Sequence, residues 1–224
     1  MTLAVRAIGQ MVAFVAVIGL LLFLPAGTLR WFEAWGFIAA FVGPSVAITL
    51  WLYVADRALL ERRMAMGDRG EPDPKQKRIQ SFMGLASVAM MITCGLDHRF
   101  GWTHVPRAFA LAADALVVVS FAIIFAVFRA NTFTSSVVEV TEKQTVVTTG
   151  PYRFVRHPMY SGALLLLAAT PIALGSLAAE AWVPIFYAGV VLRLLDEERI
   201  LKRELSGYEE YTHETRDRLI PHVW

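Results

Sequence analysis

The sequence predicts an all-α, polytopic transmembrane protein with four membrane-spanning helices, a C-terminal helical hairpin and a cytosolic polar cap. Three observations support this fold class. The 224 residues are 56% hydrophobic and only 18% charged, with a mean hydropathy of +0.52. Long uncharged stretches recur along the chain, and basic residues gather between them. A soluble domain normally has a much larger charged fraction.

Five apolar stretches predict the membrane helices in order: residues 7–29, 34–55, 79–96, 108–128 with Asp114 inside it, and 158–179. Each approaches the roughly 20 residues that a helix needs to cross the hydrocarbon core. A sixth stretch, 181–192, is shorter, and Pro171 and Gly175 interrupt the fifth. These last stretches are expected to form a helical hairpin over residues 158–200. Its second arm continues beyond the apolar run in the helix-favouring segment RLLDEERILKREL.

Basic residues distinguish the segment 56–78 from the other connections. The connections near residues 29 and 101 hold few cations. The segment 56–78 holds seven: Arg57, Arg62, Arg63, Arg69, Lys75, Lys77 and Arg78. The positive-inside rule assigns this predicted loop to the cytoplasm. The N-terminus, the segment 129–157 and the C-terminal tail then lie on the same side. We therefore divide the chain into residues 1–128, the transmembrane helices with the loop 56–78, and residues 129–224, which carry the polar motifs. The basic run MGDRGEPDPKQKR has no assigned role.

Composition excludes several other classes of protein. A net charge of +2, with its cations confined to connections, does not indicate nucleic-acid binding. The single cysteine, Cys94, lies in an apolar run, which excludes a disulfide framework and a thiolate metal site. No convincing cleavage site follows the first apolar stretch, so we expect that stretch to be retained. The run VVEVTEKQTVVTTG at 137–150 predicts an ordered loop or a short strand.

The first polar motif is GPYRFVRHPMY, residues 150–160, directly before an apolar helix. Pro158 suits the first helical position and leaves His157 as the cap. Because a helix N-terminus exposes unpaired N–H groups, His157, Arg156 and this terminus are able to hold a carboxylate or phosphate. The alternative is a basic anchor at the level of the lipid headgroups.

The second polar motif lies where the last apolar arm ends, at Arg193, Asp196, Glu197 and Glu198. Adjacent carboxylates repel each other and are costly near lipid, so we expect one of them to face a cation from another segment or a ligand. The alternative is an ordinary surface pair between Arg193 and Glu197, which are four residues apart on one helix face.

A third, weaker motif follows at the C-terminus. Gly207 is a plausible helix stop. Tyr208 and Tyr211 are able to pack against a cofactor ring or cover a cation, and interfacial aromatics without such a role are the alternative.

Taken in order, GPYRFVRHPMYSG, Arg193-x-x-x-Glu197-Glu198 and a Gly207-x-x-x-Tyr211 tail ending in RLIP resemble the isoprenylcysteine carboxyl methyltransferase family and its phospholipid methyltransferase relatives. The resemblance covers residues 129–221. It implies S-adenosylmethionine as cofactor, bound without a Rossmann glycine loop, and the sequence has no G-x-G-x-x-G. It also implies a lipophilic or prenylated acceptor at the cytoplasmic face of the membrane: an isoprenylcysteine-like carboxylate, a membrane lipid or a thiol.

The resemblance further implies roles for single residues. Residues 129–224 become the cofactor-binding catalytic region, in which Arg193 faces the acceptor, Glu197 holds the polar end of the cofactor, and Glu198 completes the catalytic patch. Glu139 is an additional candidate. The implied cofactor-binding residues are Gln144, Thr145, Val146, Val147, Tyr152, His157, Pro158, Met159, Tyr160 and Glu197.

The chemistry of the cofactor fits these residue types. Its carboxylate suits His157 and the helix start, its ammonium suits Glu197, and its sulfonium suits an aromatic face such as Tyr160. Methyl transfer from a sulfonium is an in-line displacement, so we expect no metal, and positioning supplies most of the rate.

Two other functions remain open at this point. One is an NADPH-dependent membrane reductase of related architecture, which needs additional cations for the 2′-phosphate. The other is a non-enzymatic membrane protein such as a small transporter, which normally places polar groups near mid-membrane, where only Asp114 is expected.

Overall fold

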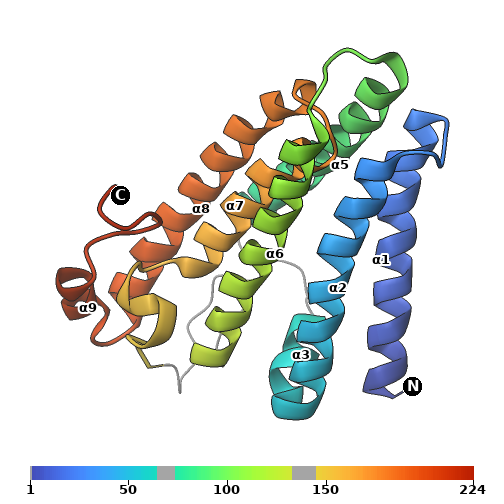
Figure 1. The fold of residues 1–224 in the computed structure, drawn as a ribbon. Coiled ribbons are helices and arrows are strands. Elements are labelled where there is room, and N and C mark those ends of the chain that lie inside the picture. Colours follow the sequence, from blue (N-terminus) through green and yellow to red (C-terminus); the bar gives the residue numbers. More distant parts are fainter. Residues whose placement is uncertain (1, 65–73, 133–144) are drawn as a thin grey trace.

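The computed structural model describes residues 2–64, 74–132 and 145–224, and all its regular elements are helices. They form one elongated bundle (Figure 1). In chain order they are α1 (Leu3–Ala26), α2 (Phe32–Ala55), α3 (Arg57–Met64), α5 (Pro74–Phe100), α6 (Arg107–Ala130), η1 (Gly150–Arg153), α7 (Pro158–Ala173), η2 (Ala178–Trp182), α8 (Val183–Glu204) and α9 (Tyr208–Glu214). The all-α prediction is confirmed. Within the segment 137–150, residues 137–144 lie outside the described part, and residues 145–149 form no strand.

In the part of the chain that the structure describes, five helical stretches are long and apolar enough to cross a membrane. They are α1, α2, α5, α6 and the continuous stretch Ala178–Glu204 formed by η2 and α8. The apolar helix α7 is shorter, with 16 residues. Four long helices and a hairpin of α7 and α8 are therefore present as predicted.

The charges of the segment 56–78 predicted a loop, but the described residues of this segment are largely helical. Residues Arg57–Met64 form α3, and α5 begins at Pro74. The Asp56 carboxylate accepts a hydrogen bond from the Leu59 backbone N–H at 2.9 Å, which stabilises the start of α3. Leu59 and Leu60 are buried in a cluster with Phe128. The helix forms because this packing outweighs its polar composition.

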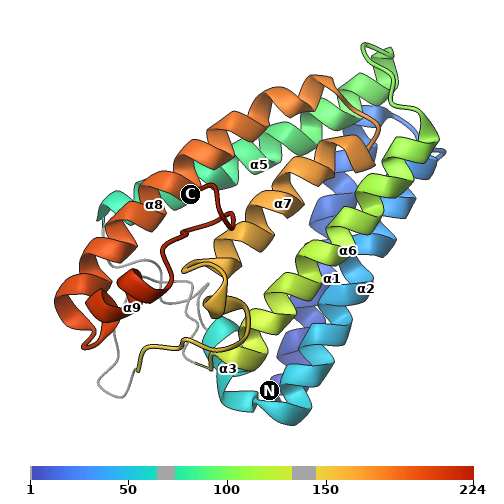
Figure 2. The same ribbon diagram turned by 60° about the vertical axis from the view of Figure 1, so that its left-hand side comes forward.

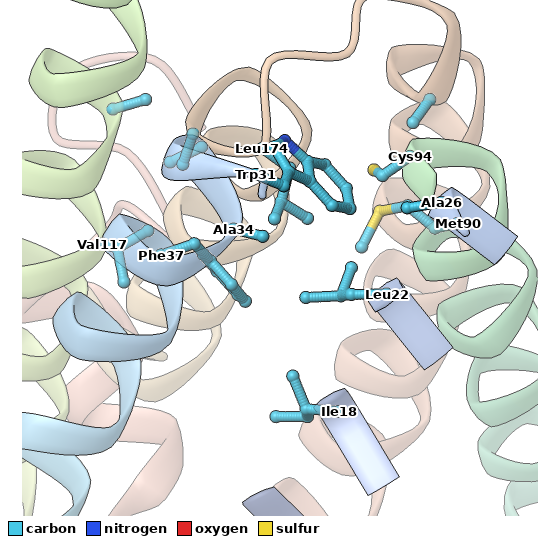
Figure 3. Close-up of a cluster of buried hydrophobic side chains, with 14 of the residues drawn as sticks. Ile18, Leu22, Ala26, Trp31, Ala34, Phe37, Met90, Cys94, Val117 and Leu174 are labelled. Atoms are coloured by element: carbon cyan, nitrogen blue, oxygen red, sulfur yellow. The ribbon is translucent and has the colours of Figure 1, made fainter. Parts of the chain in front are cut away.

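The hydrophobic core lies at the centre of the bundle and joins the first helices to the last (Figure 3). Leu22 of α1, Phe37 of α2 and Cys94 of α5 are fully buried in it, so Cys94 is a packing residue, as expected. Helices α1 and α5 cross closely at Gly95. A Cβ atom there would lie 2.7 Å from the Leu22 carbonyl oxygen, so this crossing requires glycine.

The α7–α8 hairpin turns at Gly175, whose φ of 77° is rarely adopted by residues other than glycine. The buried Asp97 at the end of α5 accepts hydrogen bonds from the Ser176 hydroxyl and, at 2.8 Å, from the Thr103 backbone N–H. Figure 2 shows α8 beside α5, with α7 between α8 and α6. The starts of α5 and α7 and the ends of α6 and α8 thus lie at one end of the bundle with α9, which we call the site end.

Candidate functional site

The start of α7 has the predicted geometry. Pro158 is the first helical residue and His157 is the N-cap. The His157 side chain does not cap its own helix, because its Nε2 lies 3.3 Å from Glu198 Oε1 of α8. The backbone N–H groups of Arg156 and His157 each donate to the C-terminal tail, to the carbonyls of Asp217 and Arg218, at 2.9 Å. The tail therefore fixes the beginning of this helix.

A buried ion cluster holds α7, α8 and the tail together. We call it the Glu198 cluster: Arg156, His157, Glu198 and Arg218. Arg156 Nε donates to Glu198 Oε1 at 2.7 Å, and Arg218 Nε donates to Oε2 at 2.9 Å. The side chains of Arg156 and Glu198 are each only 6% exposed. Of the two adjacent carboxylates, Glu198 therefore faces cations from other segments, as expected. The carboxylate that Arg156 and His157 hold is thus Glu198 of the protein itself and not a ligand's.

The neighbouring carboxylate has a different environment. We call this group the Glu197 network: Tyr160, Arg193 and Glu197. The Tyr160 hydroxyl donates to Glu197 Oε2 at 2.6 Å and accepts from Arg193 Nε at 3.1 Å. The alternative of a direct surface pair between Arg193 and Glu197 is wrong, since Arg193 is buried and the tyrosine oxygen lies between them. Among the described residues, no cation lies within ion-pair distance of Glu197.

Arg193 also contacts a residue that the sequence analysis missed. Its Nη1 donates to Gln76 Oε1 at 3.3 Å, and Gln76 Nε2 donates to Asp196 Oδ2 at 3.1 Å. Gln76 belongs to the basic run that had no assigned role. The sequence signal for burial of Gln76 was its heptad spacing with Met83 and Met90, because residues seven positions apart lie on one face of a helix.

Three tyrosines pack beside these two groups of polar residues. Tyr208 and Tyr211 of α9 are buried in one cluster, and Tyr152 and Val146 pack against it. The Tyr211 hydroxyl donates to the Tyr152 carbonyl at 2.7 Å, and the Tyr208 hydroxyl lies 3.5 Å from His157 Nε2. Burial raises the pKa of Tyr152 and that of Tyr211 to about 12, and it raises the pKa of Tyr208 as well. These phenols are therefore neutral at physiological pH.

The structure brings together most of the predicted site residues that it describes. Hydrogen bonds join His157 to Glu198 and Tyr160 to both Arg193 and Glu197. The rings of His157 and Tyr160 lie 5.8 Å apart, and Pro158 is buried. The remaining predicted residues lie around this centre or away from it. Val146 and Tyr152 pack with α9, Val147 is partly buried, Thr145 is exposed, Met159 packs toward the α3 cluster, and Gln144 and Glu139 lie outside the described residues.

The polar side chains at the site end differ in charge and in burial. In residues 2–64, 74–132 and 145–224, no group of His, Cys, Asp and Glu side chains has the arrangement of a metal site. The Glu197 network offers one half-buried carboxylate, one buried guanidinium and one tyrosine, which hydrogen bonds join to each other. Such a set is suited to a ligand that carries both a cationic and an anionic group.

The membrane-length helices and the polar site at their shared end define an integral, multi-pass membrane protein with a site at one end of its bundle. Residues 109–206 match the family model described as phospholipid methyltransferase, so this part of the chain is similar to that family. The family resemblance predicted from the motifs is thereby confirmed. The match includes η1, α7 and α8 with most of α6, whereas Gln76 and α9 lie outside it. No curated protein matches the chain.

Proposed function

We propose that this protein is an S-adenosylmethionine-dependent methyltransferase that methylates a lipophilic acceptor at the cytoplasmic face of its membrane. The family match supports methyl transfer. The basic segment 56–78 supports the orientation, because α3 and the start of α5 lie at the site end and cations favour the cytoplasmic side. The acceptor is an isoprenylcysteine-like carboxylate, a lipid or a thiol.

The observation that carries this proposal is the difference between two neighbouring carboxylates. Glu198 is neutralised by Arg156 and Arg218. Glu197 is partly buried, and among the described residues it accepts its hydrogen bond from the neutral Tyr160 hydroxyl. A desolvated carboxylate without a cation of its own suits an ammonium ligand. S-adenosylmethionine carries such an ammonium beside its carboxylate.

The other groups of the site fit the rest of this cofactor. When bound, it supplies a methyl group on a sulfonium, for which the Tyr160 ring offers an electron-rich face. The backbone N–H groups of Met159 and Tyr160, in the first turn of α7, are donors for its carboxylate, since the His157 ring already contacts Glu198. Arg193 would orient the anionic head of the acceptor. Positioning of the two reactants then supplies most of the rate.

Calorimetric titration with S-adenosylmethionine tests this proposal. Replacing Glu197 by Gln keeps an acceptor for Tyr160 and removes the charge, so binding should weaken by about 1.5 to 3 kcal/mol, or about 10- to 150-fold. Glu204→Gln is the matched control, because Glu204 lies on the same helix and pairs with the exposed Arg203. Unchanged binding in Glu197→Gln would remove Glu197 from the site.

Two further measurements complete this test. Titration of the native protein with NADPH addresses the reductase alternative, which binding of NADPH in place of S-adenosylmethionine would favour. Labelled methyl transfer to lipids extracted with the purified protein identifies the acceptor class. Absence of transfer to every extracted lipid fraction, prenylated peptide and thiol would contradict the methyltransferase proposal.

A further inference from the structure

Gln76 is a fully buried amide at the start of α5, in a part of the chain that the family match does not reach. It is 1% exposed. Its side chain points to α8, where it contacts both Asp196 and Arg193. A buried amide is costly unless its donor and acceptor are both satisfied, and these two contacts satisfy one donor and the acceptor.

The chemistry of its two partners fixes the orientation of the amide. An ionised carboxylate only accepts hydrogen bonds and a guanidinium only donates them. The Nε2 group must therefore face Asp196, at 3.1 Å, and the Oε1 atom must face Arg193, at 3.3 Å. A flipped amide would place donor against donor and acceptor against acceptor.

Asp196 is itself held in place by cations on both sides. Lys75 Nζ lies 2.7 Å from its Oδ2, and Arg199 Nη1 lies 3.0 Å from its Oδ1. A continuous series of hydrogen bonds thus runs from the exposed Lys75 and Arg199 through Asp196 and Gln76 to Arg193. From there it continues through the Tyr160 hydroxyl to Glu197.

We propose that Gln76 is a positioning residue, which orients the Arg193 guanidinium toward the acceptor by accepting a hydrogen bond from its Nη1. Its importance for turnover rests on the proposed function. The guanidinium is planar, so contacts at Nε from Tyr160 and at Nη1 from Gln76 define its plane. In this proposal Gln76 acts on the reaction through Arg193 and not by direct contact with a reactant.

Replacing Gln76 by Met tests this proposal, because methionine has a similar length and offers neither hydrogen bond. The first readout needs no turnover. It is the rate at which phenylglyoxal, an arginine-specific reagent, modifies Arg193, followed by mass spectrometry. We expect this rate to rise about fivefold, the factor equivalent to one net hydrogen bond of about 1 kcal/mol. Gln76→Glu combined with Asp196→Asn, which keeps an oxygen for Arg193 and an amide donor facing it, should restore most of the protection.

The second readout separates positioning from binding. In Gln76→Met, kcat should fall about ten- to hundredfold, as expected for a misplaced group, while the affinity for S-adenosylmethionine is kept. Ser81→Ala is the control, since Ser81 is exposed on the opposite side of α5. An unchanged modification rate at Arg193 in a folded Gln76→Met protein overturns the proposal. A raised rate in a protein that transfers no methyl group supports the role of Gln76 and contradicts the proposed function instead.

Discussion

Glu198 accepts hydrogen bonds from two arginines, whereas Glu197, its neighbour on α8, accepts one from a tyrosine. The first carboxylate joins the segment before α7 to the C-terminal tail through Arg156 and Arg218, and Arg156 also donates to the tail carbonyl of Arg216. Among the described residues, the second carboxylate joins only α7 and α8. This difference separates two uses of buried charge. Loss of a carboxylate enclosed by the protein's own cations should destabilise the fold, whereas in the proposed function the carboxylate without a cation binds a ligand.

The largest expected effect comes from breaking the Glu198 cluster. Replacing Glu198 by Gln leaves Arg156, whose side chain is 6% exposed, without its counter-charge. Removal of one partner of a buried pair costs about 3 to 5 kcal/mol, so the free energy of unfolding in detergent should fall by that amount. Chemical unfolding followed by circular dichroism measures it.

Two matched variants sharpen this result. Glu204→Gln affects an exposed pair with Arg203, and Glu197→Gln keeps an acceptor for Tyr160, so both should change stability by less than about 1 kcal/mol. If Glu197→Gln destabilises the protein as much as Glu198→Gln, both carboxylates are structural and the contrast between them is lost.

The second prediction concerns the Glu197 network. Replacing Arg193 by Ala should lower turnover about 100-fold, because the acceptor loses its orienting cation, while affinity for S-adenosylmethionine is largely kept. Single-turnover kinetics together with calorimetry measure the two quantities separately. Arg203→Ala is the control, since Arg203 lies on the same helix and is 71% exposed. Equal losses of turnover and affinity would assign Arg193 to the cofactor or to the fold.

Much of the fold was predictable from the sequence because the bilayer imposes simple requirements. Apolar stretches of about 20 residues marked α1, α2, α5 and α6. The start of α7 was also predictable, since Pro158 lacks an N–H and suits only the first turn. Helix α3 was not, because its stability depends on packing of Leu59 against residues of α2 and α6. The pattern of charges predicts on which side of the membrane that segment lies, and it does not predict whether the segment is helical.

The site was predictable only in part, for a related reason. Spacing on one helix identified Arg193, Glu197 and Glu198, because residues a few positions apart must lie near each other. Spacing did not show which carboxylate binds internal cations, since that depends on Arg218 of the tail. Gln76 lies 117 residues before Arg193, and only the folded bundle brings them together. The heptad spacing with Met83 and Met90 indicates that Gln76 shares their face of α5, but no local pattern identifies its partner on another helix.

The smallest expected effect concerns α9, which lies against both regions of the site. Replacing Tyr211 by Phe removes the hydrogen bond to the Tyr152 carbonyl and should lower the free energy of unfolding by about 1 kcal/mol at neutral pH. Tyr187→Phe, at an exposed position on α8, is the control and should leave stability unchanged.

The pH dependence of the Tyr211→Phe stability change is a sharper test than the magnitude of that change at neutral pH. Burial raises the pKa of Tyr211 and of Tyr152 from 10.0 to about 12. The folded state therefore holds the phenol protons more tightly than the unfolded state does. The stability that the neutral phenols contribute is fully present below pH 10 and is lost as pH rises through 12. The Phe variant has one ionisable phenol fewer, so its stability should fall less steeply over this range than that of the native protein. Parallel curves for the two proteins would mean that the Tyr211 phenol ionises equally well in the folded and unfolded states, and α9 would then not be packed against Tyr152 as described.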